Sequence, residues 1–169
     1  MAAAERMSTA AAFVLERARP GDAISIASLS RRLIEAGLPR ADWTPDRVVR
    51  AIRDRDRTVL VARSDAWRHP VGAMAIMKFR DDSANLDLLG VEVDLQRRGL
   101  ARQMLRWLEE SARFAGTFDI TVQLRTSNAA ALALYRSVGF TEVGRSPLYY
   151  QGLEDAIQMR WDLRVAPSA

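Results

Sequence analysis

A short basic segment, Gln96-Arg97-Arg98-Gly99-Leu100-Ala101, has the residue types and spacing of an anion-binding turn. It follows an apolar run that ends near Val93 and precedes an amphipathic helical pattern. A helix that begins in this way has unpaired backbone N–H groups, which together with the positive end of the helix dipole attract an anion. Gly99 lets a phosphate approach the backbone closely. Because the spacing matches neither a P-loop nor a dinucleotide fingerprint, the segment alone indicates either a phosphate site or a plain basic turn.

A second segment combines an amide and a phenol on one predicted helix. An apolar strand pattern over residues 122–125 is followed by Asn128, whose type favours an N-cap, and the helical pattern ends at Gly139. Tyr135 comes seven residues after Asn128, so the two side chains are expected on nearly the same face, two turns apart. Taken alone, Tyr135 could also be a core tyrosine.

Together the two segments resemble the Gcn5-related N-acetyltransferase (GNAT) superfamily, with Gln-x-x-Gly-x-Ala after one strand and Asn-x6-Tyr-x3-Gly-Phe after the next. The resemblance covers roughly residues 14–163. It implies that acetyl-CoA lies in a wedge between two splayed parallel strands. The residues it assigns to cofactor binding are Leu89, Val91, Arg97, Arg98, Gly99, Leu100, Ala101, Arg102, Asn128 and Tyr135.

The resemblance also implies catalytic roles. The Val91 N–H would face the oxyanion that develops on the acetyl group, and Tyr135 would be the general acid that protonates the departing sulfur. Bacterial relatives of the N-terminal acetyltransferase type use a glutamate as base on the strand before the cap residue, and Gln123 occupies that position here. An amide cannot accept the proton. Asp87, nine residues before Gln96, aligns with the base of the histone-acetylating branch; it could act through water or be a carboxylate in a salt bridge.

The C-terminal hairpin pattern suggests the acceptor. Residues 148–159 resemble the closing segment of protein N-terminal acetyltransferases, which places Tyr149 and Tyr150 opposite Leu38 and Trp43 as the two lips of a peptide groove. The two tyrosines could instead simply alternate faces of an edge strand. An α-amine with a pKa of ~7.7–8.0 is partly neutral near pH 7, whereas a lysine with a pKa of ~10.4 is not. A site with glutamine at the base position therefore favours an α-amine.

Two other functions stay open at this point. One is a small-molecule amine acetyltransferase acting on an antibiotic, a polyamine or an amino acid. The other is a non-catalytic acyl-CoA-binding module that has lost its base; Gln123 favours this alternative and Tyr135 opposes it.

The order of elements predicts how these residues are positioned. A strand near residues 13–17 precedes two helices, one capped by Asp22 and one beginning at Thr44-Pro45. Strands follow at 58–63, 71–80 and 86–94, then a helix from Leu100, a strand at 118–125, the helix after Asn128, and a hairpin of residues 141–150 and 155–163. A helix between two strands favours a parallel, right-handed crossover. We therefore predict an α/β domain with about seven mostly antiparallel strands, a central splayed parallel pair and about four helices.

Composition sets the remaining expectations. The 169 residues, of which 49% are hydrophobic and 27% charged, suit one domain at 13–164 between short tails at 1–12 and 165–169. The chain has no cysteine and a single histidine, His69, which we expect at the surface, so we expect no metal. The net charge of +4 comes with scattered arginines, and nucleic acid is an unlikely partner. No membrane span or secretory core is visible, so we expect a cytoplasmic protein. We expect it to be a monomer or a homodimer.

Overall fold

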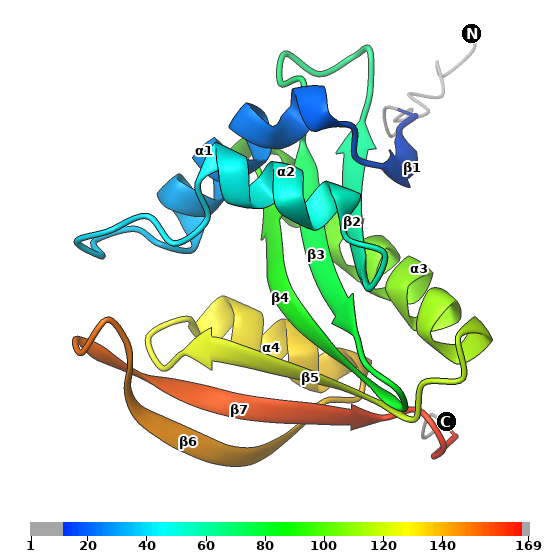
Figure 1. Ribbon diagram of the computed structural model, residues 1–169, viewed down its shortest axis with the longest axis vertical. Coiled ribbons are helices and arrows are strands. Elements are labelled where there is room, and N and C mark those ends of the chain that lie inside the picture. Colours follow the sequence, from blue (N-terminus) through cyan, green and yellow to red (C-terminus); the bar gives the residue numbers. More distant parts are fainter. Residues whose placement is uncertain (1–11, 167–169) are drawn as a thin grey trace, which may run out of the picture.

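The computed structural model describes residues 12–166 as a seven-stranded mixed sheet in the order β1-β2-β3-β4-β5-β7-β6 (Figure 1). All neighbours are antiparallel except β4 and β5, which are parallel. The strands are β1 (Val14–Arg17), β2 (Arg57–Arg63), β3 (Ala73–Phe79), β4 (Ser83–Val91), β5 (Asp119–Arg125), β6 (Thr141–Tyr150) and β7 (Glu154–Asp162). The predicted fold class, with its central parallel pair, is confirmed.

Four α-helices cover the sheet from two sides. They are α1 (Ala23–Leu33), α2 (Pro45–Arg53), α3 (Leu100–Phe114) and α4 (Ala129–Val138), with short 3-10 turns η1 (Pro20–Asp22) and η2 (Val93–Leu95). Figure 1 shows α1 and α2 on one face and α3 and α4 on the other. Two apolar clusters correspond to these layers, one joining the sheet to α1 and α2 and one joining it to α3 and α4. Strands β2 and β3 lie between both layers, which explains their continuous apolar sequences.

A β-bulge in β4 changes which face its residues present. In the ladder with β3, Ile76 pairs with Leu88 and Met77 pairs with Leu86, so Asp87 is an extra residue without a partner on β3. Leu86 packs in the α3–α4 cluster and Leu88 in the α1–α2 cluster, although residues two apart on a regular strand share a face. The bulge therefore places the Asp87 carboxylate where β4 changes its direction.

The parallel pairing of β4 and β5 is short. It runs from Ser83 opposite Asp119 to Leu86 opposite Val122 and then stops. Beyond this point the two strands diverge, β4 toward α1 and β5 toward the β6–β7 hairpin (Figure 1). The predicted splay is therefore present, and it begins at the bulge.

Several predicted boundaries need correction. The strand expected at 86–94 ends at Val91, because Val93–Leu95 form a 3-10 turn that leaves Val93 exposed. Asp22 was predicted to cap α1, but its side chain makes no cap hydrogen bond; it accepts the Arg19 backbone N–H and pairs with Arg63 instead. The predicted cap of Thr44 is confirmed, since its hydroxyl accepts the Arg47 N–H.

Two further points concern the limits of the domain. The N-terminal tail predicted at 1–12 falls almost wholly outside the described residues, as does the end of the C-terminal tail. Among residues 12–166, no helix combines the length and apolar character needed to cross a bilayer.

Candidate active site

Three adjoining pockets follow the divergence of β4 and β5. The largest of the three, about 580 Å³, lies between β4, the start of α3 and α4, and the second, about 310 Å³, lies between the α1–α2 loop and β6. A small pocket of about 50 Å³ shares residues with both. Asp87 and Gln123 line both the small pocket and the 310 Å³ pocket. Tyr135 and Asn128 line both the small pocket and the 580 Å³ pocket. The small pocket therefore joins the two larger ones.

The start of α3 forms the far wall of the 580 Å³ pocket. Gly99, the N-cap residue, has a left-handed backbone (φ +79°), and a Cβ at this position would meet no atom within 4 Å. Arg97 also has a positive φ of 62°. The first turn of the helix leaves its N–H groups without intrahelical acceptors, as predicted. The pocket is lined by Gln96, Arg97, Gly99, Leu100, Ala101 and Arg102; of the predicted cofactor residues in this loop, only Arg98 is not part of its lining.

The backbone of β4 directs two N–H groups toward β5. The Glu92 N–H donates to the Gly72 carbonyl (2.9 Å), just beyond the last ladder pair of Ala73 and Val91. A bond in this position flanks a non-hydrogen-bonded pair, and because such pairs recur at every second residue, Val91 and Leu89 both belong to that set. These two residues therefore point their N–H and C=O groups away from β3, into the divergence. Consistently, the Val91 carbonyl accepts a hydrogen bond from the Gln96 side chain (3.0 Å), which joins the loop to the strand end.

Helix α4 brings Asn128 and Tyr135 to the same pockets, as predicted from their spacing. Asn128 caps the helix by accepting the Ala131 N–H (3.1 Å), and Gly139 ends it with φ +125°. Tyr135 is only 5% exposed and packs edge-on against Phe140. Burial raises the pKa of the Tyr135 hydroxyl, and nearby Tyr150 raises it further, so the phenol is protonated at neutral pH. It is thus in the state that a proton donor requires.

Asp87 and Gln123 flank the small pocket from β4 and β5. Asp87 is in an ion pair: its Oδ2 accepts from Arg57 Nη1 (2.5 Å) and its Oδ1 accepts from Asn85 Nδ2 (2.7 Å). Asn85 Oδ1 in turn accepts from the Thr121 hydroxyl (2.8 Å). Sequence reasoning offered the salt-bridged state as one alternative for Asp87, but it gave no signal for Arg57, which lies 30 positions away.

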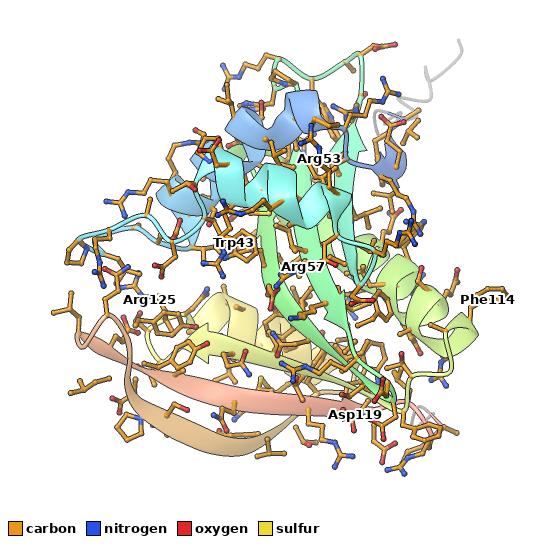
Figure 2. All side chains as sticks on the ribbon, viewed as in Figure 1. Trp43, Arg53, Arg57, Phe114, Asp119 and Arg125 are labelled. Carbon is orange, nitrogen blue, oxygen red and sulfur yellow. The ribbon has the colours of Figure 1, made fainter. Side chains whose placement is uncertain are left out.

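The predicted lips of the acceptor groove lie together around the 310 Å³ pocket. Leu38 and Trp43 are buried in the α1–α2 loop, and Tyr149 and Tyr150 approach from β6. Figure 2 shows Trp43 and Arg57 beside β4, beneath α2, and Trp43 also stacks against Arg47, whose guanidinium carbon is 4.1 Å from the ring centre. The side chains that would frame an amine substrate therefore come from both ends of the chain.

A glutamine that the sequence did not single out joins the two lips. Gln151, in the β6–β7 turn with φ +54°, accepts the Arg40 N–H (3.1 Å) and donates to the Arg40 carbonyl (2.8 Å). This double hydrogen bond connects the β6–β7 turn to the α1–α2 loop. No local pattern identifies such a residue, because its partner lies 111 positions away.

A second unpredicted connection is the ion pair of Arg125 and Glu154. Arg125, at the end of β5, donates to Glu154 (2.9 Å) and to the Ile34 and Ala36 carbonyls at the end of α1 (3.3 and 2.7 Å; Figure 2). Glu154 also accepts from the Ser127 hydroxyl and N–H (2.7 and 2.8 Å). The Ser127 hydrogen bonds, followed by Arg125, lower the pKa of Glu154 to about 2. Through Arg125 and Ser127, Glu154 at the start of β7 joins the α1–α2 lip to the loop before Asn128.

The α1–α2 loop is also held from within by Glu35. This carboxylate is 4% exposed and accepts the Asp42 and Trp43 backbone N–H groups (2.5 and 3.2 Å) and the Ser30 hydroxyl (3.1 Å). With both oxygens bonded, Glu35 fixes the shape of the loop. The 310 Å³ pocket therefore has a preformed wall on the side of the α1–α2 loop.

His69 was predicted as a surface residue, and it lies partly exposed in the loop between β2 and β3. Its side chain is 24% exposed and lies 2.9 Å from Asp94 and 3.6 Å from Glu92. The three side chains could bring ligand atoms within 4.8 Å of one another. Arg32, however, already binds both oxygens of Glu92 (2.6 and 3.1 Å), and Arg68 lies 3.3 Å from Asp94. This cluster is an ion-pair network, and Glu92 does not line any of the three pockets.

Comparison with known proteins gives a family match over the same elements. Residues 55–142 match the family model described as an acetyltransferase (GNAT) domain. The ribosomal protein bS18-alanine N-acetyltransferase of Salmonella typhimurium is 42% identical over 92 residues, which are 53% of this chain. This chain spans 62% of the length of that relative.

Solved structures extend the likeness to most of the fold. The ribosomal-protein-S18-alanine N-acetyltransferase of Escherichia coli superposes with a TM-score of 0.76 at 26% identity, covering 93% of this chain and 97% of the other. yncA from Salmonella typhimurium, solved with its cofactor acetyl-CoA, superposes with a TM-score of 0.75 at 21% identity, covering 94% and 99%. The second likeness concerns the fold alone.

Proposed function

Since the chain belongs to the GNAT acetyltransferase family, we propose that it transfers an acetyl group from acetyl-CoA to a primary amine, and that its acceptor is the N-terminal α-amine of a protein or peptide. The observation that carries this proposal is the small pocket, lined by Tyr135, that joins the two larger ones. The 580 Å³ pocket includes the turn at Gly99 and suits a thioester with a phosphate arm; the 310 Å³ pocket is lined by aromatic and polar side chains and suits a chain end.

The residues of the 580 Å³ pocket fit acetyl-CoA. The open space at Gly99 and the free N–H groups of the first turn of α3 suit a pyrophosphate, and Arg97 and Arg102 add positive charge. Leu89 and Val91 direct their N–H groups into the divergence, where an amide-bearing pantetheine arm and an acetyl carbonyl need donors. Bound acetyl-CoA supplies the activated acetyl group; the remaining steps depend on the chain's own residues.

The proposed reaction is direct attack within a ternary complex. The Val91 N–H donates to the acetyl oxygen as negative charge develops there, an interaction worth about 3–4 kcal/mol in comparable enzymes. The Tyr135 hydroxyl gives its proton to the departing sulfur. Gln123 and Asp87 border the small pocket through which the amine must approach, and Gln123 can orient it by hydrogen bonding.

Two observations support a chain end as the acceptor. The pocket between Leu38, Trp43 and the tyrosines of β6 is bounded by two segments that the Gln151–Arg40 hydrogen bonds hold together, which suits a chain end. The relative from Salmonella typhimurium is named for acetylation of an alanine of a ribosomal protein. We propose an acceptor of the same chemical kind.

The test uses CoA release, confirmed by mass spectrometry, with two peptides that share an internal lysine. One peptide has a free N-terminus and the other is blocked; polyamines and free amino acids are assayed beside them. Turnover of the free peptide alone is expected. Turnover of the small amines alone would replace the proposal with a small-molecule acetyltransferase. If every amine fails while calorimetry still detects acetyl-CoA binding, the chain is a binding module.

A further inference from the structure

The acceptor side of the site holds few groups able to take a proton. The chain's single histidine, His69, lies beside Asp94, away from the pockets. Asp87 is the only carboxylate in the lining of the small pocket that Tyr135 and Gln123 share. Any general base that acts directly at this point would therefore have to be Asp87.

Asp87 is already engaged on both oxygens. Arg57 donates to one at 2.5 Å and Asn85 to the other at 2.7 Å, and the side chains of Asp87 and Arg57 are both less than a fifth exposed. Accepting a proton would break a partly buried ion pair and leave Arg57 with Asp54 as its remaining anionic partner. Asn85, which is itself oriented by Thr121, further fixes the carboxylate. The geometry suits a structural ion pair at the bulge.

The other charged groups around Asp87 do not offer a substitute. Glu35 is saturated by three donors, and Asp42 lines the mouth of the groove but not the small pocket. Burial and the neighbouring Tyr149 raise the pKa of Tyr150, which keeps that phenol protonated. Among the described residues, the charged and titratable groups that line a pocket together with Asp87 are Glu35, Asp42, Arg47, Arg125, Tyr135, Tyr149 and Tyr150; Arg57 pairs with Asp87, and Asp54 pairs with Arg57.

We infer that this site works without a protein general base and selects amines that are already neutral, with Gln123 as the residue that orients them. The inference rests on the proposed acetyl transfer. The neutral nitrogen forms the N–C bond with its lone pair as the C–S bond breaks; the sulfur takes the Tyr135 proton, and the surplus nitrogen proton passes to water. Near pH 7 roughly a tenth of an α-amine is neutral, against about one part in a thousand of a lysine, so the substrate class follows from the amine's own pKa.

The test is the pH dependence of kcat/KM between pH 6 and 9.5 for two peptides. They differ only in an N-terminal alanine or β-alanine, whose amine pKa values are measured separately by NMR titration. The expected result is an inflection that moves with the peptide's amine. An inflection at one pH for both peptides would overturn the inference, because it would belong to an enzyme group. Failure of both peptides at pH 9.5 with saturating acetyl-CoA would instead reject the proposed function.

Two substitutions make the test specific to the named residues. Asp87→Asn keeps the size of the side chain and should change kcat/KM at pH 9 by less than tenfold. The inflection of its pH profile should still move with the pKa of the peptide's amine. Loss of a true base would instead lower the rate about 10²–10⁴-fold. Gln123→Glu adds a carboxylate at the small pocket and should raise kcat/KM at pH 6 severalfold. Circular dichroism and acetyl-CoA affinity establish that each variant is folded. A drop above a hundredfold in Asp87→Asn that is folded and binds acetyl-CoA would refute the inference.

Discussion

The two halves of the proposed site differ in what forms them: backbone groups on the acetyl-CoA side and side chains on the acceptor side. On the acetyl-CoA side, the donors are backbone N–H groups of β4 and of the first turn of α3, held by secondary structure and by Gly99. On the acceptor side, the walls are side chains and loops held by Glu35, Arg125 and Gln151. Backbone donors fixed in a helix or a strand tolerate sequence change around them. Side-chain networks depend instead on the identity of each residue that takes part.

Tyr135 lines the small pocket that joins the two halves, so its loss should have the largest effect. Tyr135→Phe removes the proton for the leaving sulfur and keeps the ring that packs on Phe140. We expect turnover to fall about 10²–10³-fold, the usual contribution of a general acid. Acetyl-CoA affinity, measured by calorimetry, should change less than threefold. Unchanged turnover would mean that the sulfur leaves without help from the helix α4 phenol.

Substitution of Gly99 tests the acetyl-CoA side of the site, which is formed by backbone groups. Gly99→Val places a β-branched residue at φ +79° and narrows the approach to the free N–H groups. We expect acetyl-CoA Kd to rise at least tenfold, measured by calorimetry, with the peptide KM changed less than twofold. Gly116→Val is the matched control, because Gly116 has φ +78° and equally open surroundings at the other end of α3. If both variants weaken acetyl-CoA binding alike, the effect comes from strain in α3 rather than from the phosphate site.

The contrast between the halves also explains what the sequence could predict. The turn at Gly99 and the pair of Asn128 and Tyr135 depend on spacing within one helix or one turn, so the sequence predicted their places at the start of α3 and on α4, where the structure has them; their roles stay predictions. The end of the preceding strand was misplaced by three residues, because the apolar Val93 continues the strand pattern although it lies exposed in a 3-10 turn.

The acceptor half was only partly predictable. Its lips, Trp43 and Tyr149 among them, were placed by family resemblance, and the structure brings them together. The Arg57–Asp87 and Gln151–Arg40 contacts join positions 30 and 111 residues apart. Arginine and glutamine are common surface residues, and these two contacts depend on the bulge in β4 and on the turn after β6. Such contacts emerge from tertiary structure and have no local signature.

Substitution of Arg125 tests the acceptor side of the site, which is formed by side chains. Arg125→Met leaves the Ile34 and Ala36 carbonyls and Glu154 without their cation, so the α1–α2 lip should loosen. We expect the peptide KM to rise about tenfold, with kcat and acetyl-CoA Kd changed less than threefold. Arg160→Met is the control, since Arg160 pairs with Asp119 at the far end of β5. Equal changes in both variants would show that the effect is a general loss of stability.

Acid should lower the stability of the acceptor side by protonating Glu154, and this is the smallest effect that we predict. A glutamate with a pKa of about 2 in the folded protein and a normal value of about 4.3 in the unfolded chain contributes stability above pH 5. That contribution is lost as the pH falls from about 5 to 2. Because the group lies near the surface, we expect about 1 kcal/mol, or ~2–4 °C in Tm.

Comparing Tm between pH 2.5 and 7 for the wild-type protein and Glu154→Gln isolates this contribution. Asp162, whose pKa Arg164 also lowers to about 2, is present in both proteins, so its acid dependence cancels in the difference. The difference should be greatest near pH 7 and shrink toward pH 2.5. A constant difference would mean that Glu154 supports the hairpin through hydrogen bonds that a neutral amide can replace only in part, and that its charge is not what joins the acceptor lip to the Asn128 loop.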